Sequence, residues 1–424
     1  MNIVIIAPFW EATGHVGNYR IKRYIDWCLE NNIYITMITS GKKNTILEKP
    51  WGKQIEVFDR FNLYTWRKQK KENNLSFSPH RKENTLRKYI VNNLLIPDPI
   101  ILWNWSVAFD SAVQEEIKNS DFILTSSPPE SLHILGMYLS KKYKKKHIID
   151  MRDGWLDESL KDSLHSKGIR YWIEKKLEAL VVKNSAIILT SSSKWLSLLI
   201  NRYKNIENKS YVITNGYPVI EEELLNKLHS NKQKNPSQNI IMTYAGRIRG
   251  SRSTQRAHHF ISPIISAGYQ LPNYHFTIQI IGRLTKEDLE EIDTIKLQNN
   301  NLKNITITLK DEVEREELFH LLSQSNVLLL TSMSISNIPS KLFEYITLKC
   351  PIFATSPKES ILFSFEKEIP QLFVNEIESP NINKTIEKIK ELSSLQDSAL
   401  VPRTYHPDEI KRKFLYIVEK HANN

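Results

Sequence analysis

Residues 338–345 read Ile-Pro-Ser-Lys-Leu-Phe-Glu-Tyr, and residues 350–354 read Cys-Pro-Ile-Phe-Ala. They follow the apolar run 326–331, so this part of the chain predicts a strand, a helix that begins near residue 340, and a second strand. A strand that leads through a loop into a helix N-terminus is the local structure on which doubly wound α/β proteins bind nucleotide phosphates and ribose. Glu344 would lie about one turn into this helix, where its carboxylate can hold the diol of a ribose.

The same alternation of apolar runs with helical patterns extends over most of the chain. In the first half we expect strands at 3–7, 33–39, 122–125, 147–150, 186–190 and 210–214, and helices at 18–31, 90–117, 130–146, 171–183 and 193–202. After a polar stretch at 226–239 we expect strands at 240–245, 276–282, 305–309, 327–331 and 351–354, and helices at 253–267, 286–299, 315–324, 340–348 and 407–421. Strands that alternate with helices predict parallel sheets.

These patterns predict an α/β protein of two Rossmann-like, doubly wound domains that face each other across a cleft. A chain of 424 residues is long for one hydrophobic core, which also favours two domains. We expect an N-terminal domain over residues 1–218, a C-terminal domain over residues 219–403, and a last helix within residues 404–424. Because such sheets bind ligands beyond the carboxyl ends of their strands, the cleft is the expected site.

Composition and the first residues indicate where the protein works. Cys28 and Cys350 lie far apart in segments of apolar periodicity, which favours buried free thiols over a disulfide. Residues 2–7 read Asn-Ile-Val-Ile-Ile-Ala, which predicts a first strand rather than a signal peptide. No apolar run approaches the ~20 residues that a membrane-spanning helix needs. We therefore expect a cytoplasmic protein.

A basic and aromatic stretch at residues 42–88 differs from the rest of the chain. It holds 13 Lys or Arg against 5 Asp or Glu, interleaved with Trp, Tyr and Phe, in a chain whose net charge is +11. This composition suits an anionic membrane surface, and hence a peripheral position on the inner face of the cytoplasmic membrane. A solvated, variable, loop-rich insertion would have the same composition, so both interpretations stay open. Nucleic acid also attracts such stretches, but we expect no nucleic-acid partner.

A glycine-containing segment follows the first predicted strand. Residues 14–18 read Gly-His-Val-Gly-Asn, and they open the first predicted helix. Glycines at this position let a ligand approach the backbone, and the helix N-terminus favours an anionic group. A plain strand-to-helix turn would give the same pattern. The GxGxxG fingerprint is absent, which argues against a nicotinamide or flavin enzyme.

Polar and charged groups follow two further strands of the first half. Residues 126–133 read Ser-Ser-Pro-Pro-Glu-Ser-Leu-His, so the prolines end the strand and His133 would lie in the first turn of a helix, facing the sheet edge. Residues 150–155 read Asp-Met-Arg-Asp-Gly-Trp, and alternation places Asp150 and Arg152 on one side and Asp153 on the other. The charged groups at 150–155 could line the cleft, although a structural ion pair that supports the loop would use the same residues.

Three arginines follow the first strand of the second half. Residues 244–252 read Tyr-Ala-Gly-Arg-Ile-Arg-Gly-Ser-Arg. Arginine is always charged and binds phosphate oxygens in pairs, so Arg247, Arg249 and Arg252 predict an anion site. Three such charges repel one another unless an anion is present, although a solvated basic turn is the alternative. Ser340 and Lys341 would add an amide and an ammonium group from the helix start.

These motifs resemble those of GT-B glycosyltransferases, in particular the large retaining family 4, over nearly the whole chain. Residues 338–345 are similar to the donor-binding segment of that family, and residues 126–133 to its Ser-Pro-Pro-x-Ser-x-His segment. The family places an arginine directly after a glycine and a lysine five residues later, both on the donor diphosphate; Arg247 matches the first and Arg252 takes the place of the second. Two departures are Gly154, where one branch has proline, and Ser336, where the family often has a glutamate on the donor sugar.

The resemblance implies a set of site residues. It implies catalytic roles for His133, Asp153, Arg247 and Arg252, donor contacts from Gly14, Gly17, Gly246, Gly282, Arg283, Ser340, Lys341 and Glu344, and an acceptor side with His15, Asp150 and Arg152. It also implies that the last helix, within residues 404–424, packs back on the N-terminal domain, that the anomeric configuration is retained, and that no cofactor and no metal is required.

The expected reaction is the transfer of a hexosyl or N-acetylhexosaminyl group from a nucleotide-diphosphate sugar. The resemblance implies UDP as the expected carrier and a glycan or lipid-linked acceptor in cell-surface polysaccharide synthesis, such as that of capsule or lipopolysaccharide. Two alternatives remain open. One is a non-hydrolysing UDP-sugar 2-epimerase of the same fold, and the other is a non-catalytic nucleotide-sugar-binding subunit that supports a partner enzyme.

Overall fold

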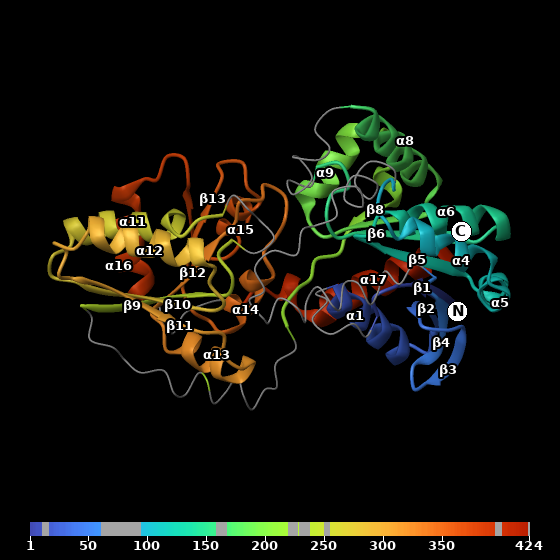
Figure 1. Cartoon of the computed structure of the whole chain (residues 1–424), viewed down its shortest axis with the longest axis horizontal. Helices are drawn as coiled ribbons and strands as arrows, with labels where there is room; N and C mark the ends of the chain where they lie inside the picture. The colour runs from blue at the N-terminus through green and yellow to red at the C-terminus, as the bar shows by residue number, and fades with distance from the viewer. Residues whose placement is uncertain are drawn as a thin grey trace. The chain divides into compact units, whose positions relative to one another are not determined.

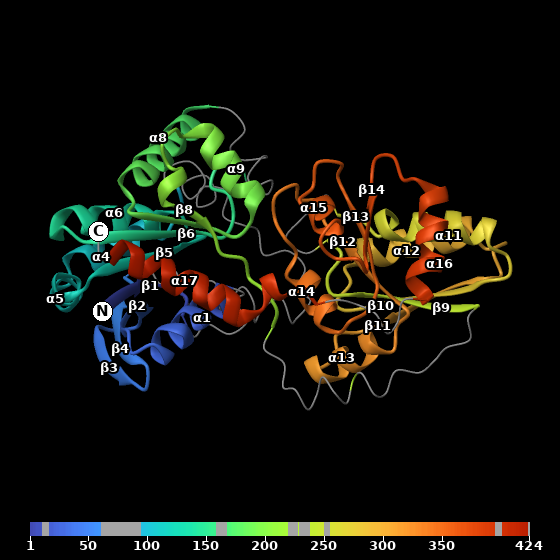
Figure 2. The same cartoon turned by 180° about the vertical axis from the view of Figure 1, so that it is seen from behind.

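The structure is a computed structural model that describes residues 1–10, 17–60, 95–157, 168–218, 228, 238–249, 255–394 and 401–422. It divides the chain into two compact units, which Figures 1 and 2 show from opposite sides. Unit 1 comprises Met1–Thr214 and Lys411–Asn424, and unit 2 comprises Asn215–Ile410. The sequence patterns had placed these divisions after residues 218 and 403.

Unit 1 is built on an eight-stranded sheet with the strand order β3-β4-β2-β1-β5-β6-β7-β8. Its strands are β1 (Asn2–Ile6), β2 (Tyr34–Gly41), β3 (Thr45–Lys49), β4 (Gly52–Phe58), β5 (Phe122–Ser127), β6 (Lys146–Met151), β7 (Ile187–Thr190) and β8 (Ser210–Val212). Neighbouring strands pair in parallel except β3 and β4. Because the strand order reverses beside β1, the unit is doubly wound, as predicted.

Helices pack on both faces of this sheet. The described helices are α1 (Gly17–Glu30), α4 (Ile101–Phe109), α5 (Ser111–Asn119), α6 (Ser131–Tyr143), α8 (Ile169–Asn184), α9 (Ser193–Arg202) and the C-terminal α17 (Pro407–Ala422). One buried cluster joins α4, α5 and α6 to the strands around β1, and another joins α8 and α9 to β6 and β7. Strands covered on both faces need apolar residues at nearly every position, which explains the continuous apolar runs of the sequence.

The C-terminal helix α17 returns to unit 1, as expected for this fold class. Its Phe414 is buried against Tyr24 and Trp27 of α1, with ring centroids 4.8 and 5.7 Å away. Lys411 donates a hydrogen bond to Glu30 of α1 at 2.7 Å. The last segment of the chain therefore completes the core of the first unit.

Unit 2 is built on a six-stranded sheet with the strand order β11-β10-β9-β12-β13-β14, and all neighbours pair in parallel. Its strands are β9 (Asn239–Ala245), β10 (His275–Ile281), β11 (Ile305–Lys310), β12 (Val327–Thr331), β13 (Ile352–Ser356) and β14 (Leu372–Glu376). Its described helices are α11 (His258–Gln270), α12 (Lys286–Gln298), α13 (Arg315–Ser323), α14 (Ser340–Thr347), α15 (Leu362–Glu366) and α16 (Ile382–Ser394). The strand order reverses beside β9.

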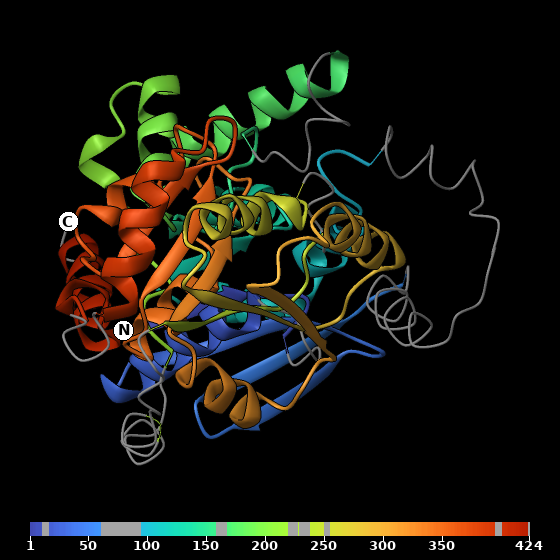
Figure 3. The same ribbon diagram turned by 90° about the vertical axis from the view of Figure 1, so that its left-hand side faces the viewer.

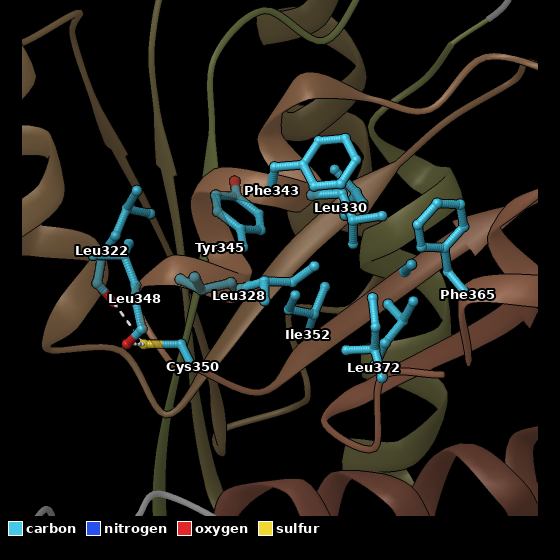
Figure 4. Close-up of a cluster of buried hydrophobic side chains, with 14 of the residues drawn as sticks. Leu322, Leu328, Leu330, Phe343, Tyr345, Leu348, Cys350, Ile352, Phe365 and Leu372 are labelled. Carbon is cyan, nitrogen blue, oxygen red and sulfur yellow. Dashed lines mark hydrogen bonds between the residues drawn. The ribbon is translucent and has the colours of Figure 1, made fainter. Parts of the chain in front are cut away.

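Helices cover both faces of the second sheet (Figure 3), and each face has its own core cluster. Helices α13, α14 and α15 contribute to one cluster, and α11, α12 and α16 contribute to the other. Figure 4 shows the first cluster, in which Phe343 and Tyr345 of α14 lie among leucines of the sheet. The thiol of Cys350 lies 3.5 Å from the carbonyl oxygen of Leu348. Cys28 and Cys350 are both buried and free, as predicted.

The basic stretch at 42–88 differs from a loop-rich insertion in its first part. Residues 45–49 and 52–58 form β3 and β4, and β4 pairs in parallel with β2 inside the sheet. Residues 61–94 lie outside the described part of the chain. Among the described helices, none is both long enough and apolar enough to cross a bilayer.

Candidate functional site

The carboxyl end of β9 brings two glycines into backbone contact in unit 2. Gly246 has a φ of +104°, and its N–H donates to the carbonyl oxygen of Ile281 at 2.7 Å. Gly282 has a φ of +144°, and a Cβ added to it would lie 2.8 Å from the carbonyl oxygen of Gly246. Both positions therefore require glycine, and the loops after β9 and β10 lie against each other. This is the edge at which the strand order reverses, where doubly wound sheets bind ligands.

Lys341, in the first turn of α14, reaches the same point. Its ammonium group donates to the carbonyl oxygen of Ala245 and lies 5.0 Å from the ring centroid of Tyr244. A Cβ added to Gly246 would lie 2.2 Å from the Lys341 nitrogen, so the glycine leaves the space that the ammonium occupies. Burial lowers the pKa of Lys341 to about 8, while Glu344 acts in the opposite direction. The ammonium group of Lys341 is therefore held against the backbone at Gly246 with little contact to water.

Glu344 lies one turn further along α14 and is half-buried. Burial raises the pKa of its carboxyl group, and the neighbouring charges of Arg315 and Lys341 lower it. The helix is held against β9 because the N–H of Ala245 donates to the Tyr345 hydroxyl oxygen at 3.3 Å. Because the buried side of α14 is packed on the sheet, Lys341 and Glu344 are held in place on the other side of the same helix.

The three predicted arginines do not share one role. Arg247 is exposed directly after Gly246, as an anion ligand would be. Arg249 instead donates to Asp288 at 2.9 Å and to Glu291 at 2.8 Å, both on α12. Its charge is neutralised within the protein, so the expectation that all three arginines need an external anion is wrong for Arg249. Arg252 lies outside the described residues.

The remaining predicted donor residues divide between the two units. Arg283 is exposed after Gly282, and Ser340 is exposed as the first residue of α14. Gly17 begins α1 in unit 1, at the carboxyl edge of β1. Gly14 and His15 lie outside the described residues.

In unit 1, Arg152 joins the ends of two strands to the start of a helix. Its guanidinium group donates to the carbonyl oxygens of Ser127 and Pro128 at 2.9 and 2.8 Å. A Cβ added to Gly17 would lie 2.1 Å from the same guanidinium group. Arg152 and Asp153 are both half-buried, which leaves part of each side chain accessible. The predicted segments at 14–18 and 150–155 are therefore brought together at Gly17 and Arg152.

Asp150 is corrected from an acceptor contact to a buried structural ion. It is fully buried and accepts hydrogen bonds from Arg20 at 2.6 and 2.8 Å and from Ser126 at 2.8 Å. Burial opposes its charge, but Arg20 and Ser126 more than offset this and lower the pKa of Asp150. Arg20 was not predicted, although a charged residue beside Ile21, on the apolar side of the first helix, was a signal that a buried partner exists.

His133 is likewise enclosed rather than facing an open edge. Its Nδ1 lies 2.7 Å from the Thr125 hydroxyl, and Nε2 of His147 lies 2.8 Å from the same hydroxyl. Burial lowers the pKa of His133 to about 4, so the ring is neutral at neutral pH. His133 has no exposed surface, whereas the sequence predicted that it faces the edge of the sheet. Neighbouring segments cover the first turn of α6, so His133 is buried in the interior of unit 1.

Among the residues that the structure describes, no three His, Cys, Asp or Glu side chains lie where they could hold a metal ion together. The arrangement in unit 2 instead offers a lysine, an exposed arginine and a helix N-terminus to an anion, and a carboxylate to hydroxyl groups one turn away. This combination suits a nucleoside diphosphate.

Comparison with known proteins gives structural matches only. No protein-family model and no curated protein sequence matches this chain. Sucrose-phosphate synthase from Thermosynechococcus elongatus is similar with a TM-score of 0.58 and 11% identity, over 99% of this chain and 98% of that chain. HepE from Anabaena in complex with UDP gives a TM-score of 0.57 and 12% identity, over 99% and 100% of the two chains. The lipopolysaccharide outer core galactosyltransferase WaaB gives 0.58 and 11%, over 99% of both.

At this level of identity the likeness concerns the fold, and it covers nearly the full length of each chain. Two doubly wound units, reversals of strand order beside β1 and β9, and a last helix that returns to unit 1 agree with the predicted fold class. The chain therefore has the GT-B fold.

Proposed function

We propose that this protein is a glycosyltransferase that transfers a sugar from a nucleotide-diphosphate donor, with uridine as the base, to a hydroxyl group of a glycan or lipid-linked acceptor. The observation that carries the proposal is the meeting of Gly246, Gly282, Lys341 and Glu344 at the reversal point of the unit 2 sheet. HepE, a structural neighbour, has been solved with UDP and with UDP-glucose, which supports uridine as the base.

In this proposal each group of the unit 2 site has a separate task. Arg247, Lys341 and the amide of Ser340 hold the diphosphate and stabilise the charge that grows on it as the sugar departs. Arg252 adds a further cation if it follows the family pattern. Glu344 accepts hydrogen bonds from the ribose hydroxyls. The donor needs no metal because fixed protein charges neutralise the leaving group, and the configuration at the anomeric carbon is retained.

Unit 1 supplies the acceptor side in this proposal. Arg152 remains the candidate contact for the acceptor, with Asp153, the candidate catalytic carboxylate, next to it in the chain and Gly17 at the start of α1 beside it. Asp150 and His133 are buried and hold the strand ends in place, so they support the acceptor side without contacting the acceptor. A role in cell-surface polysaccharide synthesis, and contact with the inner membrane surface, belong to the same proposal.

Ligand binding tests the donor assignment. A ligand that binds only the folded state at ~100 times its dissociation constant adds ~2.7 kcal/mol to the free energy of unfolding. We expect UDP and UDP-sugars to raise the melting temperature more than GDP, CDP or their sugars. Incubation of the preferred UDP-sugar with candidate acceptors, followed by mass spectrometry, should then show a glycosylated product. Equal stabilisation by all three bases, or none by any, would reject the donor assignment.

The ribose contact can be isolated by pairing a variant with a ligand analogue. Wild-type protein should bind UDP about 10-fold or more tightly than 2′-deoxy-UDP, because a hydrogen bond to a charged group contributes ~1.5–3 kcal/mol. Glu344→Gln should lose most of this preference. Glu290→Gln, an exposed carboxylate on α12 in the same unit, is the matched control and should keep it. A wild-type protein without the preference would remove Glu344 from the ribose site.

A non-hydrolysing 2-epimerase is the second candidate, because a UDP-GlcNAc 2-epimerase from Methanocaldococcus jannaschii also matches, with a TM-score of 0.50 and 11% identity over 99% of this chain and 100% of that chain. Such an enzyme needs no acceptor. Conversion of UDP-GlcNAc to an isomer in a reaction that contains only protein and nucleotide sugar would favour it over a transferase.

Ser336 keeps a non-catalytic nucleotide-sugar-binding subunit open as a third candidate. It is buried in the loop before α14, where the family often has a glutamate. A scaffold needs no leaving-group ligand, so an Arg247→Ala variant that binds UDP weakly yet supports full activity of a partner enzyme would favour this candidate.

A further inference from the structure

A large open pocket lies in unit 1 at the carboxyl ends of β2 and β4, against the second half of α4. Its volume is about 880 Å³, and its lining includes Lys42, Lys43, Phe58, Arg60, Trp105 and Phe109. Binding sites for small ligands usually measure ~300–1,000 Å³. The candidate nucleotide site of unit 2 uses none of these residues.

Two nearly parallel aromatic rings line one side of this pocket. Trp105 and Phe109 lie one turn apart on α4, with ring centroids 6.1 Å apart and an interplanar angle of 11°. Each is 64% exposed, whereas Trp103 and Val107 of the same helix are buried in the core. The rings are therefore not needed to hold α4 on the sheet. A flat, exposed apolar surface fits the C–H face of a sugar ring, because stacking removes apolar area from water.

Three basic side chains also line the pocket. Lys42, Lys43 and Arg60 are exposed and form no ion pair with any described residue. The carboxylate among the lining residues, Asp110, already accepts hydrogen bonds from Asn44 and from the N–H of Val113, both at 3.0 Å. The charge that faces the pocket is therefore positive, which favours an anionic ligand.

The pocket continues along the sheet edge. Lys42 and Lys43 also line a neighbouring pocket of about 510 Å³, which extends to Trp10 and includes one carboxylate, that of Glu56. Trp10 also lines a cavity of about 20 Å³ with Gly17 and Arg152, which is too small for a sugar ring. The two larger pockets, which we call the acceptor groove, suit a chain of several sugar rings. A bilayer presents a flat surface and would not fill two concave pockets, whereas a glycan chain can.

We propose that the acceptor groove binds an acidic glycan. Sugar rings stack on Trp105 and Phe109, and carboxylate or phosphate substituents lie against Lys42, Lys43 and Arg60. The assignment of this glycan as the acceptor rests on the proposed function, whereas its binding does not.

Calorimetric titration of the full chain without nucleotide tests the proposal. The probes are trigalacturonate, which carries carboxylates, glucose 6-phosphate, which carries a phosphate, and neutral maltotriose. We expect at least one acidic probe to bind at least 10-fold more tightly than maltotriose, and its affinity to fall as salt screens the lysines. The acidic probe that binds more tightly identifies the substituent.

Two variants locate the binding. Trp105→Ala should weaken the acidic probe at least 10-fold, whereas Trp172→Ala, a 57% exposed tryptophan on α8 of the same unit, should not change it. The double variant Lys42→Gln, Lys43→Gln should reduce the salt dependence. Binding of neither acidic probe, equal binding of maltotriose, or Trp105-dependent binding of phosphatidylglycerol vesicles in place of the sugars would overturn the proposal.

The same variants separate this proposal from the proposed function. Trp105→Ala should leave the affinity for UDP unchanged. If the protein binds UDP but neither acidic probe, only the proposal of an acidic-glycan site is refuted. If it binds an acidic probe but no nucleotide, only the proposed glycosyltransferase function is refuted.

Discussion

Lys341 occupies an unusual position for a charged side chain. Its ammonium group lies over the Tyr244 ring and against the backbone at Gly246, where glycine alone leaves room. The carbonyl oxygen of Ala245 and an aromatic face replace only part of the water that burial removes. An arriving diphosphate would supply the missing counter-charge, so the group is poised to gain from anion binding.

The pKa of Lys341 leads to a pH dependence of donor binding. Burial lowers this pKa to about 8, so the side chain is mostly charged at pH 7 and mostly neutral at pH 9. If UDP binds the charged form, its dissociation constant should change little below pH 7 and rise about tenfold per pH unit above pH 8. Calorimetric titration at pH 6.5, 7.5, 8.5 and 9.5 measures this change.

Lys341→Met provides the comparison for this titration. It should bind UDP more weakly at pH 7 and lose the rise above pH 8, whereas Lys286→Met, an exposed lysine on α12, should behave as the wild type does. An unchanged pH profile in Lys341→Met would show that another group titrates.

The loop after β9 contains Arg247 and Arg249, which the sequence motif does not distinguish but which have different surroundings in the structure. Arg249 holds the buried Asp288 and the partly buried Glu291, so Arg249→Met should lower the free energy of unfolding by ~1–3 kcal/mol and leave UDP affinity unchanged. Arg247→Met should do the reverse, with stability within ~0.5 kcal/mol of the wild type and UDP affinity lowered about 10-fold or more. Urea denaturation and calorimetry measure the two effects. Loss of UDP affinity in the Arg249 variant only would reverse these roles.

The contact of β5, β6 and α6 contains two neutral histidines that share the Thr125 hydroxyl. The unfolded chain protonates His133 near pH 6.5, but the folded chain protonates it only near pH 4. Stability is therefore fully present above pH 6.5 and is lost as the pH falls toward 4. The loss from His133 alone between pH 7 and pH 5 is about 2 kcal/mol, and His147, whose pKa burial also lowers, adds to it in the same direction.

Chemical denaturation at pH 7 and pH 5 measures this loss. The double variant His133→Gln, His147→Gln should be less stable at pH 7 but should lose less stability on acidification than the wild type. An equal acid loss in both proteins would show that carboxylates such as Asp150, and not the histidines, set the acid sensitivity.

At the scale of elements, the sequence predicted the helices and strands whose apolar residues form a regular pattern. Buried strands such as β1, β12 and β13 were found from their continuous apolar runs, and the amphipathic α14 from the helical spacing of its apolar residues. The buried strand β14 was not predicted. β3 and β4 were missed because they lie in a basic stretch whose composition resembles that of a loop, although Ile55, Glu56 and Val57 alternate as strand residues do. The site residues were predicted by chemical type alone. In the structure Arg247 is exposed and Arg249 is half-buried, whereas His133 and Asp150 are fully buried. The sequence could not predict this difference, because the depth of a side chain depends on packing between distant segments.

At the scale of the whole molecule, the chain leaves unit 1 after Thr214 and returns to it at Lys411. The return depends on Phe414, which is fully buried beside Tyr24 and Trp27. Phe414→Ala should therefore lower the stability of unit 1 by ~3–5 kcal/mol. Tyr416→Ala, 64% exposed on the same helix, is the matched control and should change it by less than ~0.5 kcal/mol. Urea denaturation followed by tryptophan fluorescence measures both, and equal stability of the two variants would show that α17 does not complete the unit 1 core.

The central claim is that a nucleoside diphosphate binds where the loops after β9 and β10 meet the start of α14. Hydrogen–deuterium exchange of the full chain, with and without saturating UDP, tests this claim most directly, because bound ligand slows the opening of the backbone that it contacts. We predict slower exchange at residues 246–249, 282–284 and 340–344. Binding of UDP without slower exchange in these three segments, or with slower exchange confined to unit 1, would contradict the claim.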